Sequence, residues 1–239
     1  MKIKIISCLQ DNYSYLIIDE KKNIACVVDP SESNPIIEHL EKNKIDLKFI
    51  LNTHHHYDHV GGNKKLKEKY GAEVIGFKGD KNRIPEIDIL IDDQETWKYE
   101  SFEAKIIHVP GHTLGHICFY FYNEKSIFTG DTLFSLGCGR IFEGSYFQMF
   151  NSLKKFKELP NNTKVYCGHE YTKQNSKFCI AHDKNNQNLI KKIIEIENKI
   201  QNNLPTIPST IKDELECNIF LRSDNVKTFS KLRDLKDNF

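Results

Sequence analysis

Four histidines and one aspartate crowd into the short segment "THHHYDH". Imidazole nitrogens and carboxylate oxygens are the ligands that zinc, iron and manganese take from proteins. At strand spacing, His54 and His56 point to one side and His55 to the other. As the chain leaves the strand and turns toward a helix, Asp58 and His59 can be aimed at a second, nearby point. The spacing therefore offers two ligand sets that face a common centre, and we expect His55 to turn away into structural hydrogen bonds.

Three more candidates, His112, Asp131 and His169, lie at the ends of predicted strands, each with glycine beside it. Glycine lets the chain turn sharply, and functional groups of layered α/β proteins gather at such strand-to-loop transitions. A histidine-rich polar loop is the plainer interpretation of the first segment alone, but it does not explain all four motifs. Together the residues suit two divalent ions with open positions, zinc first and iron or manganese compatible. The set is His54, His56, Asp58, His59, His112, Asp131 and His169.

The elements that position these residues follow from short runs rich in Ile, Val, Phe and Tyr, which predict strands through the first 170 residues. Helices are predicted in "SNPIIEHLEKNK", "VGGNKKLKEKYG" and "SYFQMFNSLKKFKEL". From about residue 170 to Asn203 the chain is largely helical, and an apolar stripe over 189–200 predicts core packing. We therefore expect an α/β domain over 1–169 and a small helical domain over 170–239.

Composition narrows the class of partner. The chain has 239 residues and a formal net charge of +1, so no global field attracts nucleic acid or an anionic membrane. Its seven cysteines form no C-x-x-C pair, which favours a reduced compartment. No signal-peptide pattern and no apolar run of membrane-spanning length is evident. We expect a cytoplasmic monomer that binds neither nucleic acid nor membrane.

The motifs "THHHYDHVGG", "PGHTLGH", "FTGDTLF" and "CGHEYT" resemble the five-motif signature of the metallo-β-lactamase superfamily. More narrowly, "GCGRIFEG", "GHEYT", "PSTIKDELECNIFLR" and "RDLKDNF" are similar to the glyoxalase II, or hydroxyacylglutathione hydrolase, family. The similarity runs essentially end to end. It implies an αββα metallo-β-lactamase sandwich with a small C-terminal helical domain and a dinuclear site at one edge.

The resemblance also implies roles. His54, His56 and His112 would hold one metal ion, Asp58, His59 and His169 a second, and Asp131 would bridge both. The implied reaction is hydrolysis of S-(2-hydroxyacyl)glutathione, such as S-D-lactoylglutathione, to glutathione and D-lactate by a metal-bridged hydroxide. That step belongs to methylglyoxal detoxification. Asp58 and Asp131 are the expected catalytic carboxylates, Asp58 mainly as a ligand.

Glutathione carries two carboxylates, so its recognition needs positive charge. By resemblance, the substrate-binding residues are Arg140, Phe142, Tyr171, Arg233 and Lys236. Arg140 stands where the animal-type pattern has lysine, and Phe142 stands where it has tyrosine. The first difference keeps the charge, whereas the second removes a hydroxyl group.

Other functions remain open from the sequence. An iron-dependent glutathione persulfide dioxygenase would need only His54, His112 and Asp131, and the intact remaining ligands argue against it. A nuclease of the same fold is disfavoured by the neutral charge. Cys138 and Cys167 are expected to be buried packing residues rather than ligands. Structural roles are expected for the remaining histidines, and His116 is a candidate for orienting the site.

Overall fold

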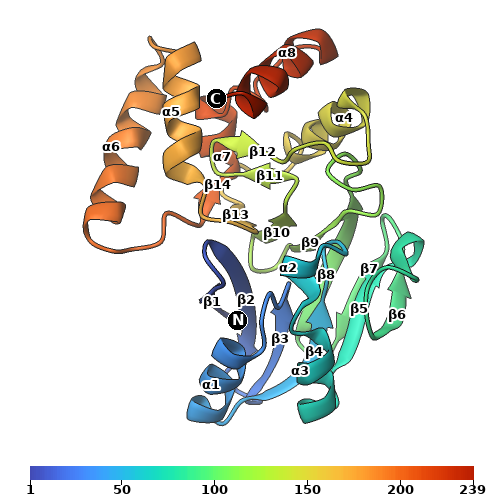
Figure 1. The fold of residues 1–239 in the computed structure, drawn as a ribbon. Helices are drawn as coiled ribbons and strands as arrows, with labels where there is room; N and C mark the ends of the chain where they lie inside the picture. The colour runs from blue at the N-terminus through green and yellow to red at the C-terminus, as the bar shows by residue number, and fades with distance from the viewer. The chain divides into compact units, whose positions relative to one another are not determined.

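The computed structural model describes residues 1–239, and the chain forms two compact units. Unit 1 comprises residues 1–108 and 115–124, and unit 2 comprises residues 109–114 and 125–239 (Figure 1). These units divide the chain at other points than the boundary expected near residue 170, because two strands, a hairpin and a helix before that position belong with the C-terminal helices.

Unit 1 is built on a six-stranded sheet in the order β1-β2-β3-β4-β5-β6. β1 to β3 are antiparallel neighbours, and β3 to β6 are parallel. The inner strand β3 is buried along its whole length and reads as an uninterrupted apolar run, as a strand covered on both faces must. The strands are β1 Lys2–Cys8, β2 Asn12–Asp19, β3 Ile24–Val28, β4 Asp46–Leu51, β5 Glu73–Phe77 and β6 Ile87–Ile91.

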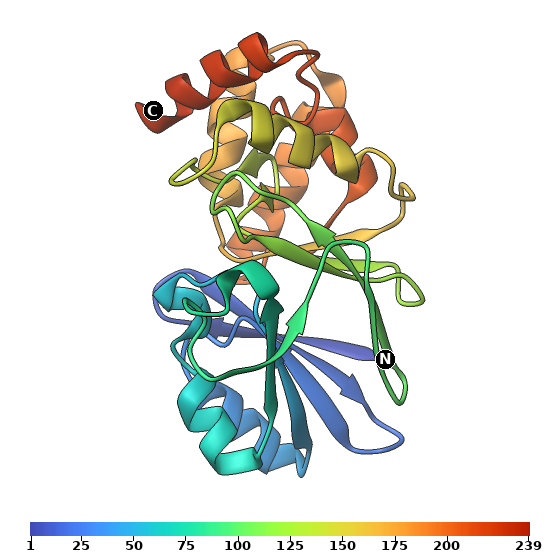
Figure 2. The same cartoon turned by 90° about the vertical axis from the view of Figure 1, so that its right-hand side faces the viewer.

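Both faces of this sheet are covered within unit 1. On one face, Ile36 and Leu40 of α1 and Leu66 of α3 are buried in a cluster with strand residues, as Figure 2 shows for the two helices. On the other face, the Phe49 ring of β4 packs edge-on against Trp97 of β7, with centroids 5.0 Å apart. The helices are α1 Asn34–Asn43, α2 Tyr57–Val60 and α3 Asn63–Tyr70, and the second ladder is β7 Thr96–Tyr99, β8 Phe102–His108 and β9 Ile117–Phe121.

Unit 2 combines a short ladder with a hairpin and five helices, and the helices are shown yellow to red in Figure 1. β10 pairs with β13 in parallel, β13 pairs with β14 antiparallel, and β11 and β12 form the hairpin. The strands are β10 Ser126–Gly130, β11 Leu133–Phe134, β12 Gly137–Cys138, β13 Lys164–Cys167 and β14 Ser209–Thr210. The helices are α4 Tyr146–Phe156, α5 Thr172–His182, α6 Gln187–Gln201, α7 Ile211–Cys217 and α8 Val226–Asp237.

The helix starts in unit 2 are encoded locally. Ser145 with Gln148 and Thr210 with Asp213 form capping boxes that satisfy backbone donors at the beginnings of α4 and α7. The side chain of Asn225 accepts a hydrogen bond from the backbone of Thr228 at the start of α8. Short polar signals therefore fix where each of these helices begins.

The predicted α/β class with C-terminal helices is confirmed. The apolar stripe of α6 is narrower than predicted, because Leu189 and Ile196 are buried whereas Ile194 is 55% exposed. Strands β6, β7 and β14 and the β11–β12 hairpin were not predicted, and β11, β12 and β14 are only two residues long. None of the helices combines the length and the apolar character that crossing a membrane requires.

Candidate metal centre and substrate pocket

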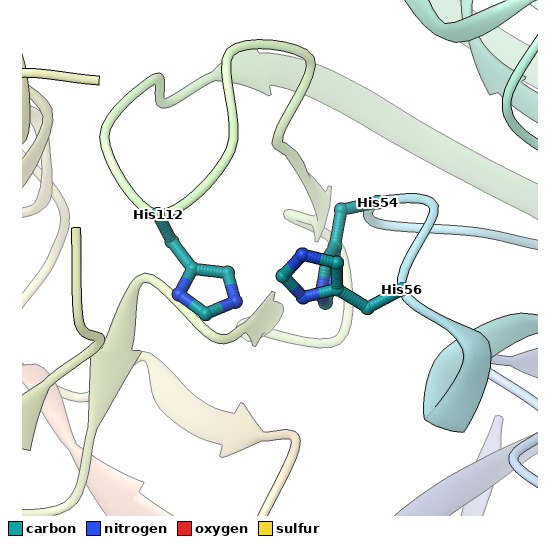
Figure 3. Close-up of side chains that lie close together, drawn as sticks. All are labelled: His54, His56 and His112. Carbon is teal, nitrogen blue, oxygen red and sulfur yellow. The ribbon is translucent and has the colours of Figure 1, made fainter. Parts of the chain in front are cut away.

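The histidine-rich segment leaves β4 at Leu51 and ends in the short helix α2. The rings of His54 and His56 lie side by side with centroids 4.7 Å apart; Figure 3 shows both, together with His112 from the loop after β8. His54 and His59 are buried, whereas His56 and Asp58 are partly exposed. The segment thus presents its donors at the boundary between core and solvent.

One buried carboxylate, Asp29, holds two of these histidines in place. Asp29 is 2% exposed and accepts hydrogen bonds from the Thr53 amide at 2.8 Å, the Thr53 hydroxyl at 2.6 Å and His59 Nδ1 at 3.1 Å. Because the Thr53 hydroxyl donates to Asp29, it accepts from His54 Nδ1, 3.0 Å away. Both imidazoles are therefore protonated on Nδ1, which makes Nε2 the nitrogen suited to a metal ion.

The donor atoms of Asp29, His54 and His59 all lie within 4.8 Å of one another, so this trio could itself hold a metal ion. The Asp29 oxygens already accept three hydrogen bonds from neighbouring donors. Asp29 is therefore better suited to orienting the histidines than to binding an ion. The ring of His116 adds to this support, since it stacks on His54 with centroids 4.7 Å apart.

His55 turns away from the other histidines, as expected. Its Nδ1 lies 3.3 Å from Oδ2 of the buried Asp80, and its Nε2 contacts Arg83. Arg83 also pairs with Asp80 at 3.5 Å. The His55 ring is thus part of a structural network inside unit 1.

In unit 2, two histidines converge on one carboxylate. Asp131 Oδ2 lies 3.6 Å from His112 Nε2 and 3.2 Å from His169 Nε2, and all three side chains are buried. Asp131 follows Gly130, whose φ of +46° lies in the left-handed region that favours glycine. The strand β10 therefore ends in a turn that re-aims the next side chain toward the histidines.

His112 is oriented by the backbone. Its Nδ1 donates to the carbonyl of Arg140 at 2.7 Å, so Nε2 again faces the carboxylate. Gly139 allows this approach, because a Cβ there would meet the Asp131 carbonyl oxygen at 1.9 Å and His112 Nδ1 at 3.2 Å. The ring of His169 stacks on Tyr171 with centroids 4.7 Å apart.

The chemistry of these donors fits divalent metal ions. In each unit, histidine Nε2 atoms face a carboxylate oxygen: His59 Nε2 lies 3.5 Å from Asp58, and the unit 2 pair faces Asp131. The Nδ1 atoms of His59 and His112 are held by a carboxylate and a carbonyl. Such outer hydrogen bonds are typical of metal-bound histidine.

A cavity of about 450 Å³ opens in unit 2 beside His112 and Asp131. Its wall includes every residue that the sequence analysis assigned to substrate binding, namely Arg140, Phe142, Tyr171, Arg233 and Lys236. Arg140 is exposed and Arg233 is 4% exposed, so only the former is free to move. Burial, followed by the charges of Arg233 and Arg140, lowers the pKa of Lys236. The cavity wall therefore combines three cationic side chains with aromatic rings.

Family comparisons agree with this arrangement. The sequence model described as "Metallo-beta-lactamase superfamily" matches residues 10–169, and the model described as "Hydroxyacylglutathione hydrolase C-terminus" matches residues 170–239. The chain is 74% identical to a hydroxyacylglutathione hydrolase of Pelagibacter ubique (strain HTCC1062) over 239 residues, covering 100% of both chains. The chain belongs to the hydroxyacylglutathione hydrolase family.

A more distant member of this family, from Methylococcus capsulatus, is 40% identical over 253 residues, covering 100% of this chain and 99% of the relative. Among solved structures, ETHE1 from Myxococcus xanthus has a TM-score of 0.75 at 22% identity and covers 98% of this chain and 90% of its own. The BLEG-1 B3 metallo-beta-lactamase has a TM-score of 0.72 at 21% identity, covering 93% and 100%. These structural likenesses establish the metallo-β-lactamase fold alone.

The sequence analysis missed the residues that support the candidate site. Asp29 ends β3 in "VVDP", the same strand-then-aspartate pattern as "FTGD", and that parallel was the available signal. In unit 2, consecutive backbone groups of the β11–β12 hairpin are bonded by side chains of α5, of α7 and its C-cap Asn218, and of α8. The bonds are Asn175 to Ser135 O, Cys179 to Leu136 O, Leu136 N to Glu214, Asn218 to Gly137 O and Arg233 to Cys138 O.

These hairpin contacts connect the site to the C-terminal helices. The hairpin runs from just after Asp131 to just before Arg140, so its position sets both a carboxylate and a pocket cation. Glu214, the α7 member of the set, is fully buried, and this burial raises its pKa to about 7. No sequence motif predicts such contacts between residues that are far apart in the chain.

The seven cysteines are all buried and unpaired, and the burial expected of Cys138 and Cys167 is confirmed. Burial raises the pKa of Cys138, and it raises that of Cys167 to about 12. Neither thiol is ionised near neutral pH, so neither is suited to nucleophilic chemistry.

Proposed function

We propose that the chain hydrolyses S-(2-hydroxyacyl)glutathione thioesters, with S-D-lactoylglutathione as the representative substrate, to glutathione and a 2-hydroxy acid. The single observation that carries this proposal is the cavity of about 450 Å³ whose wall joins His112 and Asp131 to three cationic side chains. A thioester of an anionic tripeptide needs both features, positive charge for the carboxylates and donors for a metal ion at the reacting carbonyl. Removal of such thioesters belongs to methylglyoxal detoxification.

Two divalent ions are proposed for each chain, with zinc first and iron or manganese as alternatives. In this proposal His54, His56 and His112 would hold one ion, Asp58, His59 and His169 would hold the other, and Asp131 would be a ligand of both. The Nε2 orientation within each unit supports this assignment. When bound, such ions polarise a carbonyl group and lower the pKa of water from about 15.7 toward 7.

The protein's own groups have defined tasks in this proposal. Asp131, with two histidines facing one of its oxygens, supplies the shared negative charge that keeps two cations close together. Asp58 acts mainly as a ligand, and Asn12 fixes its Oδ2 by donating a hydrogen bond at 3.0 Å. Asp29 and the Arg140 carbonyl keep the imidazoles oriented. The leaving thiolate needs no strong acid, because thiols have a pKa near 8.5.

Substrate recognition is assigned to the pocket. Arg140 and Lys236 approach the glutathione carboxylates, and Arg233 contributes its charge from the buried wall. Tyr171 offers a hydroxyl group, and Phe142 closes one side with an apolar ring that meets His112 edge-on, with centroids 5.1 Å apart. We assign residues 1–169 to catalysis and residues 170–239 to glutathione binding, in a cytoplasmic monomer.

Hydrolysis is tested with purified, metal-loaded protein and S-D-lactoylglutathione, by following the loss of thioester absorbance. We expect turnover that disappears after chelation and returns when zinc is added. Absence of metal-dependent turnover would reject the proposal. The persulfide dioxygenase alternative is not favoured, because the full-length relatives are hydroxyacylglutathione hydrolases. Oxygen uptake with glutathione persulfide and one iron per chain would restore it.

A further inference from the structure

The pocket wall contains a carboxylate that neither metal binding nor catalysis uses. Besides Asp131, the only acidic residue in the lining of the cavity is Asp237. One of its oxygens, Oδ1, lies 2.9 Å from Arg233 Nη2 and 3.4 Å from Arg140 Nε. A single oxygen thus lies within reach of two of the three cationic side chains proposed to recognise glutathione.

Local helix energetics do not explain this residue. Asp237 is the last residue of α8, where the negative end of the helix dipole disfavours a carboxylate. Its pairing with Arg233 at i,i+4 places the basic residue first, which is the weaker order on a helix. The favourable electrostatic contacts of Asp237 therefore come from the arginines of the pocket rather than from its position in the helix.

The mobility of the three partners differs. Arg233 is 4% exposed, and its Nη1 donates to the Cys138 carbonyl at 2.6 Å, so its guanidinium is fixed. The side chains of Arg140 and Asp237 are 61% and 36% exposed, so both can move. An incoming carboxylate can therefore replace Asp237 beside Arg233 without rearranging the buried wall.

We propose that Asp237 is an internal counter-ion of the glutathione pocket, whose carboxylate holds Arg140 and Arg233 until a carboxylate of the substrate takes its place. This inference rests on the proposed function and deepens it. Exchange of one carboxylate for another keeps the buried cation paired at every stage, which avoids the cost of an uncompensated charge. The exchange also limits the affinity for glutathione. Glutathione must displace Asp237 in order to bind, and Asp237 displaces glutathione when the product leaves.

Asp237→Asn separates charge from structure. The amide oxygen still accepts a hydrogen bond from Arg233, but the competing negative charge is gone. We expect reduced glutathione to bind the metal-loaded variant about two- to fivefold more tightly than the natural protein, the range of a partly exposed ion pair. KM for S-D-lactoylglutathione should fall by a similar factor, and product inhibition by glutathione should strengthen.

The matched control is Asp234→Asn, which removes one charge from the same helix. Asp234 accepts a hydrogen bond from Tyr146 and does not line the cavity, so glutathione affinity should equal that of the natural protein. An equal gain in both variants would overturn the proposal, since it would reflect net charge alone. Unchanged or weaker binding in Asp237→Asn would overturn it as well. If that variant fails to fold by its thermal transition, Asp237→Ser, which also removes the carboxylate, decides the same question.

Calorimetric binding of glutathione is independent of turnover. If the natural protein binds glutathione but hydrolyses no thioester, the proposed function fails while the counter-ion inference is still judged by Asp237→Asn. If the protein hydrolyses S-D-lactoylglutathione and Asp237→Asn gains no affinity, the counter-ion inference alone fails.

Discussion

The two units hold the metal ligands proposed for them in different ways. Unit 1 contributes four donors from the six residues 54–59, and one buried carboxylate, Asp29, braces two of the histidines. Unit 2 contributes His112, Asp131 and His169, which are far apart in sequence and are held by backbone turns, a carbonyl and a clamped hairpin. A contiguous motif can be positioned by one side chain, whereas dispersed donors depend on the packing of a whole unit.

The largest effect that tests this comparison is expected at the carboxylate on which the unit 2 histidines converge. Asp131→Ala removes the acceptor that faces both His112 and His169. We expect kcat/KM for S-D-lactoylglutathione to fall by at least roughly 10³-fold, since metal charge stabilisation is worth several kcal/mol. Metal content should fall in parallel. The exposed Asp224 provides the control, and Asp224→Ala should retain full activity and metal content.

A smaller loss is expected at the brace of unit 1. Asp29→Asn removes the charge that orients Thr53 and His59 while leaving all proposed ligands in place. Metal affinity should fall by about 10- to 100-fold, as for other residues that orient metal-bound histidines. Excess zinc should restore most of the activity, a rescue not expected for Asp131→Ala. Unaltered metal affinity would mean that the contiguous motif needs no brace.

A smaller loss of activity is expected when a cation is removed from the pocket of unit 2. Lys236→Ala removes a cation from the cavity wall without touching the metal ligands. KM for the glutathione thioester should rise roughly tenfold, the value of a hydrogen bond to a charged group, with a much smaller change in kcat. Lys231→Ala, an exposed lysine on the same helix, is the matched control. A fall in kcat at constant KM would contradict the assigned role.

How much of the fold and of the candidate site could be predicted from the sequence depends on how far apart in the chain the interacting residues lie. The separation of His54 and His56 from His55 was predicted from strand alternation. In the structure β4 ends at Leu51 and these histidines lie in the loop before α2, so strand alternation is not what separates them. The structural hydrogen bond expected of His55 is present, to Asp80. The donors of unit 2 were recognisable by their glycine neighbours, such as Gly130, whose φ of +46° turns the chain before Asp131. Local chemistry therefore carries most of the information about the metal centre.

The residues that the sequence did not disclose act over long separations. Glu214 and Arg233 bond to the backbone of the hairpin, 78 and 95 residues away. Asp237 reads as one more charged residue near the end of the chain, and only the packing of α8 places it beside Arg140. Such roles arise from which segments meet in the folded unit, and residue type and spacing do not encode that.

The smallest predicted effect concerns a comparison of two buried carboxyl groups, one from each unit. In unit 1, Asp29 accepts hydrogen bonds from the Thr53 hydroxyl and from His59 Nδ1. In unit 2, Glu214 is fully buried, and this burial raises its pKa from 4.5 to about 7. Between pH 4.5 and about pH 7, Glu214 keeps its proton in the folded chain and has released it in the unfolded chain. The stability that Glu214 contributes is therefore complete below pH 4.5 and is lost as the pH rises through about 7.

Glu214→Gln removes this titration while keeping an acceptor oxygen for the Leu136 amide, 2.9 Å from the carboxylate. The Tm of the variant relative to the natural protein should rise between pH 5 and pH 8 by about 2–4 °C or more, the shift that 1 kcal/mol produces in a chain of this size. Thermal unfolding followed by circular dichroism at both pH values measures it. A Tm difference that stays constant with pH would show that Glu214 keeps an ordinary pKa, and hence that the hairpin of unit 2 is held by a charged carboxylate, as the histidines of unit 1 are held by Asp29.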